Sequence, residues 1–205
     1  MAGPVLEYWF EFASTYSHVA TQRIEAVAKR AGVALAWRPF LLGPIFKEQG
    51  WNTSPFNIQL AKGAYMWRDV ARECSKHAIG FHRPSEFPRN GLLAARVATA
   101  LGEQPHLPAF ARAVYVANFR DDEDISKPST LRRLLQGAGA TDPDAVLDRA
   151  GSDEVKALLR ARTEEAVARG VFGAPSFFAG DELFWGNDRL EDAIEWCRRA
   201  SAANP

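Results

Sequence analysis

VLEYWFEF at residues 5–12 runs directly into ASTYS at residues 13–17, and this junction predicts how the chain begins to fold. The apolar run is typical of a buried strand, and the segment after Ser17 has the periodicity of a helix. A small hydroxyl residue at a strand-to-helix turn lies among unpaired backbone N–H groups, so the turn favours a bound anion. Redox proteins with this arrangement carry Cys-x-x-Cys, whereas this chain carries Ser14-x-x-Ser17. Ser14 could donate a hydrogen bond to a thiolate from another molecule, or it could simply be the N-cap of the helix.

A second strand is predicted after the first helix. Apolar residues recur at helical spacing from Ala20 to Ala31, and Gly32 is placed to end the helix at its C′ position. Residues 33–37 (VALAW) then predict a short buried strand that Pro39 ends. Two strands joined by a helix in this way lie parallel, with a right-handed crossover.

Helix signals dominate between residue 41 and about residue 150, and strand signals are almost absent there. Ser54-Pro55 and Asp142-Pro143 each place a capping residue before a proline suited to the first helical position. Helices are predicted over residues 55–78, 90–102, 107–120, 129–138 and 143–150. A segment of roughly 110 residues is large enough to form a packed layer of its own.

The alternation of helix and strand returns after residue 150. A helix is predicted between Ser152 and Gly170, and the last helix, 189–199, begins with Asp188 and Glu191 in the spacing of a capping box. Two short strands lie between these helices, at residues 176–179 and 182–185.

The predicted order is therefore β-α-β, a large helical insertion, and α-β-β-α. This order predicts an α/β protein with a four-stranded mixed sheet and helices on both faces, which is the thioredoxin-like fold. We expect residues 1–40 and 151–205 to form the thioredoxin-like domain and residues 41–150 to form an inserted helical domain.

The composition narrows the class of protein. Hydrophobic residues make up 47% and charged residues 24% of the chain, as in ordinary soluble globular proteins. The 25 basic residues balance the 25 acidic ones, which argues against binding nucleic acid or a membrane surface by bulk electrostatics. No stretch approaches the ~20 apolar residues that span a bilayer, and no export signal is visible at the N-terminus. Cys74 and Cys197 have no metal or redox spacing, so we expect two buried cysteines, no metal site and a cytoplasmic protein.

Two turns near the C-terminus supply further candidate contacts with a ligand. The Ala174-Pro175 bond lies in the turn that faces the first helix in this fold; if it is cis, the backbone of Ala174 is presented beside Ser14 for β-type hydrogen bonds. The alternative is a proline that only begins a strand. WGND at residues 185–188 either caps the last helix or binds a ligand's carboxylate and ammonium groups. Glutathione combines a thiol, a peptide backbone and such an amino-acid end.

With these motifs the chain resembles the 2-hydroxychromene-2-carboxylate isomerases and the kappa-class glutathione transferases, in the DsbA-like branch of the thioredoxin fold. The likeness covers nearly the whole chain. FEFASTYSHVATQRIE at residues 10–25, the helical insertion and GVFGAPSFFAGDELFWGNDRLE at residues 170–191 carry it, and the last stretch is the most specific. The family usually has proline after the first serine, whereas this chain has Thr15.

The resemblance implies how glutathione would be bound. Ser14 would orient and activate the thiolate, and the backbone of Ala174, before cis-Pro175, would pair with the cysteinyl part. The γ-glutamyl end would be held by Trp185, Gly186, Asn187 and Asp188.

Substrate-contacting positions of the isomerases correspond to residues in the insertion. Lys47 and Asn57 match two of these positions, although each could equally be a solvated polar residue. Phe87 stands where an aromatic residue, often tyrosine, is expected. Asp69 matches an acidic position that is expected to help hold the site together.

The family reaction converts 2-hydroxychromene-2-carboxylate to trans-o-hydroxybenzylidenepyruvate in the breakdown of naphthalene-type aromatics. The glutathione thiolate adds to a conjugated carbon, the resulting single bond rotates, and elimination restores the alkene. The resemblance thus implies an isomerase with glutathione as cofactor, a small aromatic carboxylate as substrate, and a homodimer. A kappa-like glutathione transferase or peroxidase and a non-catalytic binding protein are the alternatives. A dithiol oxidoreductase is nearly excluded, because neither cysteine lies at the motif.

Overall fold

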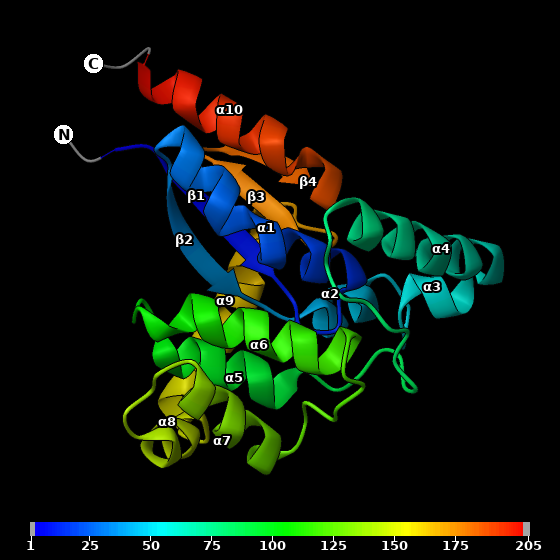
Figure 1. The fold of residues 1–205 in the computed structure, drawn as a ribbon, viewed down its shortest axis with the longest axis vertical. Helices are drawn as coiled ribbons and strands as arrows, with labels where there is room; N and C mark the ends of the chain where they lie inside the picture. Colours follow the sequence, from blue (N-terminus) through cyan, green and yellow to red (C-terminus); the bar gives the residue numbers. More distant parts are fainter. Residues whose placement is uncertain (1–2, 203–205) are drawn as a thin grey trace.

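A four-stranded mixed sheet lies at the centre of the computed structural model, which describes residues 3–202 (Figure 1). The strands are β1 (Val5–Phe10), β2 (Ala34–Pro39), β3 (Ser176–Ala179) and β4 (Glu182–Trp185). Their order is β2-β1-β3-β4; β1 and β2 are parallel, and β3 is antiparallel to both β1 and β4. The predicted thioredoxin-like sheet is confirmed.

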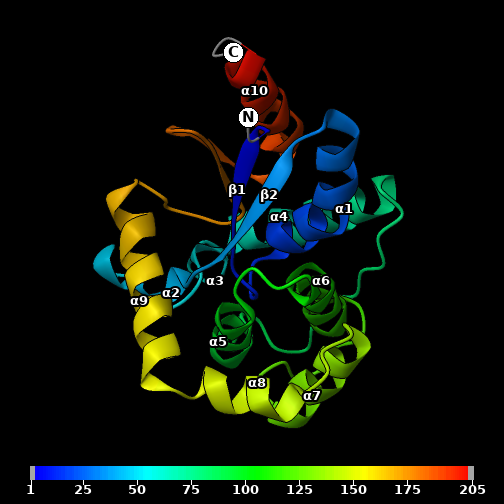
Figure 2. The ribbon, with the colours of Figure 1, turned by 90° about the vertical axis from the view of Figure 1, so that its left-hand side faces the viewer.

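Helices cover both faces of this sheet and extend beyond one end of it. They are α1 (Thr15–Ala31), α2 (Leu42–Glu48), α3 (Pro55–Ile58), α4 (Leu60–Lys76), α5 (Leu92–Leu101), α6 (His106–Phe119), α7 (Pro128–Gly137), α8 (Pro143–Ala150), α9 (Asp153–Ala168), the 3₁₀ turn η1 (Asn187–Arg189) and α10 (Leu190–Ala202). Figure 2 shows α1 and α9 on opposite faces of the sheet, with α5 to α8 below it. The long α1 ends where Gly32 adopts φ 67° and its N–H bonds back to the helix, as the sequence predicts.

The strand β1 is apolar on both faces, and each face packs in a different core. Leu6, Tyr8 and Phe10 belong to the largest buried cluster, with residues of α1, α5, α6 and α10. Trp9 points to the other face, where it packs with Phe178 and residues of α9. Fully burying one such side chain contributes about 1.5–3 kcal/mol, so β1 is the strand on which both layers depend.

Helices α5 to α8 share the largest core with the sheet, whereas α2 and α4 pack in two smaller clusters. Phe12, just after β1, packs edge-on against Phe110 of α6 at a ring separation of 6.3 Å and lies 5.2 Å from the ring of Tyr115. The predicted division of the chain at residues 40 and 150 stays a prediction, but α5 to α8 of the insertion rest directly on the sheet's own core.

Three element boundaries differ from those predicted. The helix α2 was not predicted, and the helix expected over residues 55–78 is divided at Gln59, whose φ of −101° and ψ of 89° are not helical. Gly63 accounts for this break, because the backbone carbonyl of Phe56 approaches it more closely than any side chain would allow. Strand β2 continues to Pro39, which is possible because β2 lies at the edge of the sheet.

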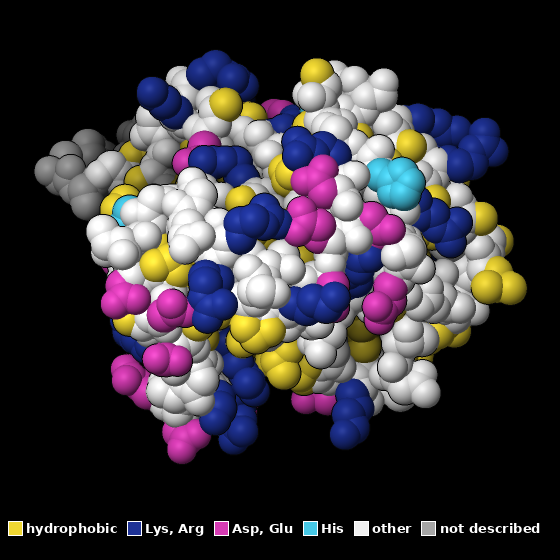
Figure 3. All heavy atoms as spheres, turned by 60° about the horizontal axis from the view of Figure 1, so that its bottom comes forward, with side chains coloured by type: hydrophobic (Ala, Val, Ile, Leu, Met, Phe, Trp, Pro, Cys, Tyr) yellow, Lys and Arg dark blue, Asp and Glu magenta, His cyan; other side chains and the backbone are white. Residues whose placement is uncertain are grey.

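The surface and the cysteines agree with the expectations from composition. Figure 3 shows basic and acidic side chains interspersed over the face that it presents. Within residues 3–202, no helix is long and apolar enough to cross a membrane. Cys74 and Cys197 are both buried.

Candidate functional site

Ser14 is the N-cap of α1, and its hydroxyl also reaches across to the turn before β3. Its Oγ accepts a hydrogen bond from the Ser17 N–H at 3.1 Å and donates one to the Ala174 carbonyl at 2.8 Å. The two interpretations of Ser14 from the sequence are therefore compatible. The hydroxyl oxygen caps the helix, while the hydroxyl proton is directed at the position where a peptide-like ligand is expected.

The Ala174–Pro175 peptide bond is cis, which is one of the two alternatives that the sequence left open. Ala174 is half-buried at the cavity described below, and its N–H has no acceptor among the described residues. Its carbonyl is bonded to Ser14. The backbone of Ala174 thus offers one donor and one acceptor in the arrangement that an extended peptide requires.

The first turn of α1 has unused donors beside Ser14. The N–H groups of Thr15 and Tyr16 have no acceptor within residues 3–202, and the first turn contains no acidic residue. Unpaired N–H groups at a helix N-terminus carry partial positive charge, so an anion beside Ser14 is stabilised. Thr15 is buried and begins the helix normally, so the threonine in place of the family's proline leaves the helix start intact and adds one N–H donor.

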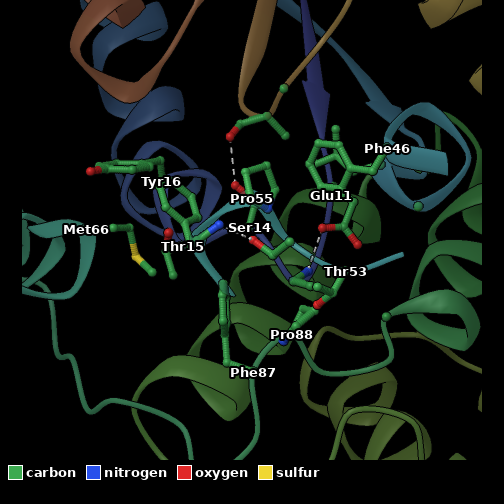
Figure 4. Close-up of a pocket in the computed structure, with 18 of the residues that line it drawn as sticks. Glu11, Ser14, Thr15, Tyr16, Phe46, Thr53, Pro55, Met66, Phe87 and Pro88 are labelled. Atoms are coloured by element: carbon green, nitrogen blue, oxygen red, sulfur yellow. Dashed lines mark hydrogen bonds between the residues drawn. The ribbon is translucent and has the colours of Figure 1, made fainter. Parts of the chain in front are cut away.

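These groups open into a cavity of about 1480 Å³ (Figure 4). We call its Ser14 side the floor, which consists of Ser14, Thr15, Tyr16, Ala174 and residues 185–188. We call the opposite side the wall, which consists of residues from 41–56 and 86–92. Pockets for single small molecules typically have about 300–1000 Å³, so this cavity has room for two ligands.

Three carboxylates line the cavity beside or within the floor. Asp69 and Glu73 of α4 line the cavity together with Asp188. Tyr16 donates its hydroxyl proton to Asp69 at 2.8 Å, and burial, followed by this hydrogen bond, raises the pKa of Tyr16. Asp69 therefore ties α4 to the first turn of α1, the role that the resemblance implied for it. An ammonium group is the ligand that such a group of carboxylates favours.

Asn187 is held on both sides of its amide. Its Oδ1 accepts from Arg23 of α1 at 2.9 Å, and its Nδ2 donates to Glu73 of α4 at 3.1 Å. The side chain is buried and connects three segments that are far apart in sequence. A ligand would therefore meet the backbone of residues 186–188 and the side chain of Asp188 rather than the amide of Asn187.

The capping box predicted at Asp188 and Glu191 is wrong. The 3₁₀ turn η1 precedes α10, with Gly186 as its N-cap and no capping side chain. Glu191 pairs with Arg23 instead, which keeps it away from the helix start. Asp188 is exposed and carries one ion pair, with Arg189 at 3.5 Å, so its carboxylate is available at the cavity. Gly186 has a φ of 109°, a conformation that favours glycine.

The predicted substrate-contacting residues occupy different positions. Lys47 of α2 and Phe87 line the cavity on the wall side. Asn57 is not among the lining residues; its amide donates to Thr53 Oγ1 at 3.2 Å and to the Phe87 carbonyl at 3.1 Å. Asn57 thus holds the loop that presents Phe87. Trp185 is half exposed at the other end of the cavity, with its ring 4.8 Å from that of Phe172.

Three residues at the site were not singled out from the sequence. Lys62 of α4 lines the cavity, with its Nζ 5.7 Å from the Phe56 ring. Arg23 anchors Asn187. Glu11 is a buried carboxyl that lines the cavity just before Ser14. An acidic residue inside an apolar strand-to-helix junction is the signal that could have identified Glu11.

Comparison with known proteins places this fold and site in a family. The DSBA-like thioredoxin domain matches residues 5–195, nearly the entire chain. The chain belongs to the DsbA-like thioredoxin family.

Two groups of DsbA-like relatives are similar to the chain over most of its length. A 2-hydroxychromene-2-carboxylate isomerase of Sphingobium xenophagum is 30% identical over 187 residues, which cover 91% of this chain and 94% of that protein. Glutathione S-transferase kappa 1 of Homo sapiens is 27% identical over 199 residues, which cover 91% of this chain and 87% of that protein. Both relatives are enzymes, and this DsbA-like protein is an enzyme.

A solved structure of a 2-hydroxychromene-2-carboxylate isomerase matches this DsbA-like fold with a TM-score of 0.82. It is 26% identical, and the match covers 98% of this chain and all of the other. The helices inserted between β2 and α9 are therefore included in the likeness, along with the sheet.

Proposed function

We propose that this protein is a glutathione-dependent isomerase that acts on 2-hydroxychromene-2-carboxylate or a similar aromatic carboxylate. The observation that carries the proposal is the hydrogen bond from Ser14 to the carbonyl of Ala174 before a cis proline, at the open N-terminus of α1. This arrangement places a hydroxyl that donates to the Ala174 carbonyl beside the helix N-terminus, and no cysteine is among the described residues that line the cavity. Its reactive sulfur would therefore come from the ligand.

The residues of the floor fit glutathione along its length. The N–H and C=O of Ala174 match the backbone of the cysteinyl residue. When a ligand N–H donates to the Ala174 carbonyl, the Ser14 hydroxyl can turn its proton from that carbonyl to the adjacent sulfur. The γ-glutamyl ammonium would face Asp188 and Asp69, while its carboxylate would meet the N–H groups of Asn187 and Asp188 at the start of η1, because the Gly186 N–H already bonds the Pro175 carbonyl.

Bound glutathione supplies a thiolate that adds reversibly to a conjugated carbon and so permits rotation about the former double bond. Ser14 and the N–H groups of Thr15 and Tyr16 keep the sulfur ionised, since each interaction favours the charged form. Outside the floor, the ammonium groups of Lys47 and Lys62 would hold the substrate carboxylate. Phe87 would pack against the aromatic ring.

A kappa-like glutathione transferase is the second candidate, favoured by the human relative and by the same floor residues. In that enzyme glutathione is consumed, whereas in the isomerase it is regenerated. A homodimer and a place in the breakdown of naphthalene-type aromatics belong to the isomerase proposal through the resemblance alone, and the cytoplasmic location belongs to it through the cysteine usage.

An assay of chromene isomerisation with and without reduced glutathione tests the proposal. We expect turnover only with glutathione, an unchanged glutathione concentration at the end, and thermal stabilisation by ~2.7 kcal/mol at a hundredfold excess over Kd. A stable conjugate with a model electrophile, without isomerisation, would favour the transferase. A melting temperature that does not respond to glutathione would contradict the proposal and favour the third alternative, a non-catalytic binding protein.

A further inference from the structure

Glu11 is a buried carboxyl that lines the cavity near Ser14 and has no role in the proposed binding of glutathione. It lies on the loop between β1 and α1, is 9% exposed, and lines the same cavity as Ser14. In Figure 4 the two side chains lie near each other, with Phe46 and Thr53 on the side of Glu11 and Tyr16 on the side of Ser14.

The contacts of Glu11 leave one carboxylate oxygen without a donor. Oε2 accepts from the Ala13 N–H at 3.0 Å, and no donor to Oε1 is found within residues 3–202. The backbone carbonyl of Glu11 is occupied separately, by the Tyr115 hydroxyl at 2.8 Å and the Ser14 N–H at 3.0 Å. Gly91 lies against Oε1: a Cβ added there would be 3.4 Å from it.

Within residues 3–202, no cation neutralises this carboxyl. None of the described lysine, arginine or histidine nitrogens lies within 4.0 Å of it. The N–H groups of Ala13 and Ser14 act on the carboxyl, whereas the Tyr115 hydroxyl of α6 bonds the backbone carbonyl of Glu11. Lys47 and Arg89 line the same cavity, but the Arg89 guanidinium bonds the Glu123 carbonyl, Ser85 and Asp122. Burial therefore raises the pKa of Glu11 to about 7, with the N–H groups of Ala13 and Ser14 opposing the rise.

We propose that Glu11 is the base that takes the thiol proton of glutathione when it binds and returns that proton when the thiol leaves. The S–H bond breaks with its electron pair staying on sulfur, and the proton forms an O–H bond at Oε1. The thiolate then lies beside a neutral acid instead of a second anion. This inference rests on the proposed function, because it needs a thiol in the cavity.

The thiol of bound glutathione and the carboxyl of Glu11 have similar pKa values, so the proton can pass between them. A free thiol has a pKa of about 8.5, and the helix N-terminus and Ser14 lower it toward that of Glu11. Once the thiolate has formed, its charge opposes ionisation of Glu11, so the proton stays on the carboxyl. A proton-transfer group is most useful when its pKa lies near the working pH, which Glu11 satisfies.

Proton release on binding tests this role without any assay of turnover. Titration calorimetry of reduced glutathione at about pH 7.5, in buffers of different ionisation enthalpy, counts the protons released. We expect wild-type protein to release almost none, because Glu11 captures the thiol proton, and Glu11→Gln to release about one per site. S-methylglutathione, which has no thiol proton, should release none from either protein. Glu86→Gln, at another glutamate lining the cavity, is the matched control and should behave as wild type.

Release of about one proton by the wild type would overturn the proposal, since the proton then goes to solvent. Absence of glutathione binding to both proteins would instead overturn the proposed function, which separates the two failures.

A second measurement does not involve glutathione. Because the folded pKa of Glu11 is raised, native protein binds more protons than unfolded protein between pH 4.5 and about 7. The free energy of unfolding of the wild type should therefore fall, relative to that of Glu11→Gln, as the pH rises through that window. Glu11→Gln is a suitable reference because it retains an acceptor for the Ala13 N–H. Parallel melting curves across the window would show that Glu11 does not titrate near neutrality and would also overturn the proposal.

Discussion

Replacing Ser14 by alanine should separate a capping role from a chemical one. The change removes the acceptor for the Ser17 N–H, worth about 1 kcal/mol for an N-cap, and the bond to Ala174, worth about 1 kcal/mol. We expect a loss of about 2 kcal/mol in the free energy of unfolding. In a protein of this length that loss corresponds to a melting temperature lower by about 4–8 °C.

Ser152→Ala is the matched control for this prediction. Ser152 caps α9 by accepting from the Val155 N–H at 3.3 Å and lies outside the cavity lining. Its replacement should cost about 1 kcal/mol of stability and leave turnover unchanged. Both proteins remain folded at assay temperature if the loss is of this size, so their activities can be compared directly.

The chemical effect of Ser14→Ala should appear in turnover. Loss of a hydrogen bond to a charged sulfur is worth about 1.5–3 kcal/mol, which corresponds to a ten- to hundredfold lower rate. The rate should also require a higher pH, because the thiolate forms less readily without its donor, while glutathione binding stays largely intact. Steady-state kinetics from pH 6 to 9 measure both. If Ser14→Ala loses stability but keeps wild-type turnover and pH profile, Ser14 is only a helix cap and the reasoning fails.

Three further predictions concern stability and binding. His18 is buried, and burial lowers its pKa to about 4, so between pH 6.5 and 4 the unfolded protein binds a proton that the native protein does not. The free energy of unfolding should therefore fall as the pH drops from 6.5 to 4. Urea unfolding should show a shallower fall for His18→Phe. Gly63→Ala should destabilise the protein by about 1–3 kcal/mol, because the new methyl meets the backbone carbonyl of Phe56. Gly43→Ala should not destabilise it, because a Cβ there has no atom within 4 Å. Equal melting temperatures of the two variants would contradict this prediction. Asp188→Asn should change the free energy of unfolding by less than about 0.5 kcal/mol, because Asp188 is exposed and has one weak ion pair. It should remove much of the rise in melting temperature that glutathione causes. A rise as large as that of the wild type would exclude the Asp188 carboxylate from the glutathione site.

The sheet and most helices could be predicted because each carries a local signal. The apolar run before Ser14, the glycine after α1 and the prolines at helix starts act within a few residues. The helix α2 lacks such a signal: Leu41 provides no side-chain cap, and Gly43-Pro44 reads as a turn. The break at Gln59 depends on how closely α3 approaches Gly63, a tertiary contact that no sequence window contains.

The candidate site also combines residues that have local sequence signals with residues that only tertiary contacts bring together. Ser14 and the cis bond before Pro175 have local signals in the strand-to-helix junction and in a proline that precedes a strand. The bridge from Arg23 through Asn187 to Glu73 joins residues more than a hundred positions apart, so only the folded chain reveals it. Glu11 was visible in the sequence, but its burial and the absence of a cation beside it are properties of the packed cavity.

The floor and the wall of the cavity come from different parts of the chain, and this has an evolutionary consequence. The floor is fixed by strand pairing and by the turn at Pro175, whereas much of the wall is loop between α2 and α5. Mutations in those loops can change which second ligand enters while the Ser14 hydroxyl, the Ala174 backbone and the first turn of α1 stay as they are. If the proposed function holds, an isomerising and a conjugating enzyme could diverge by remodelling one side of such a cavity, without losing affinity for glutathione on the way.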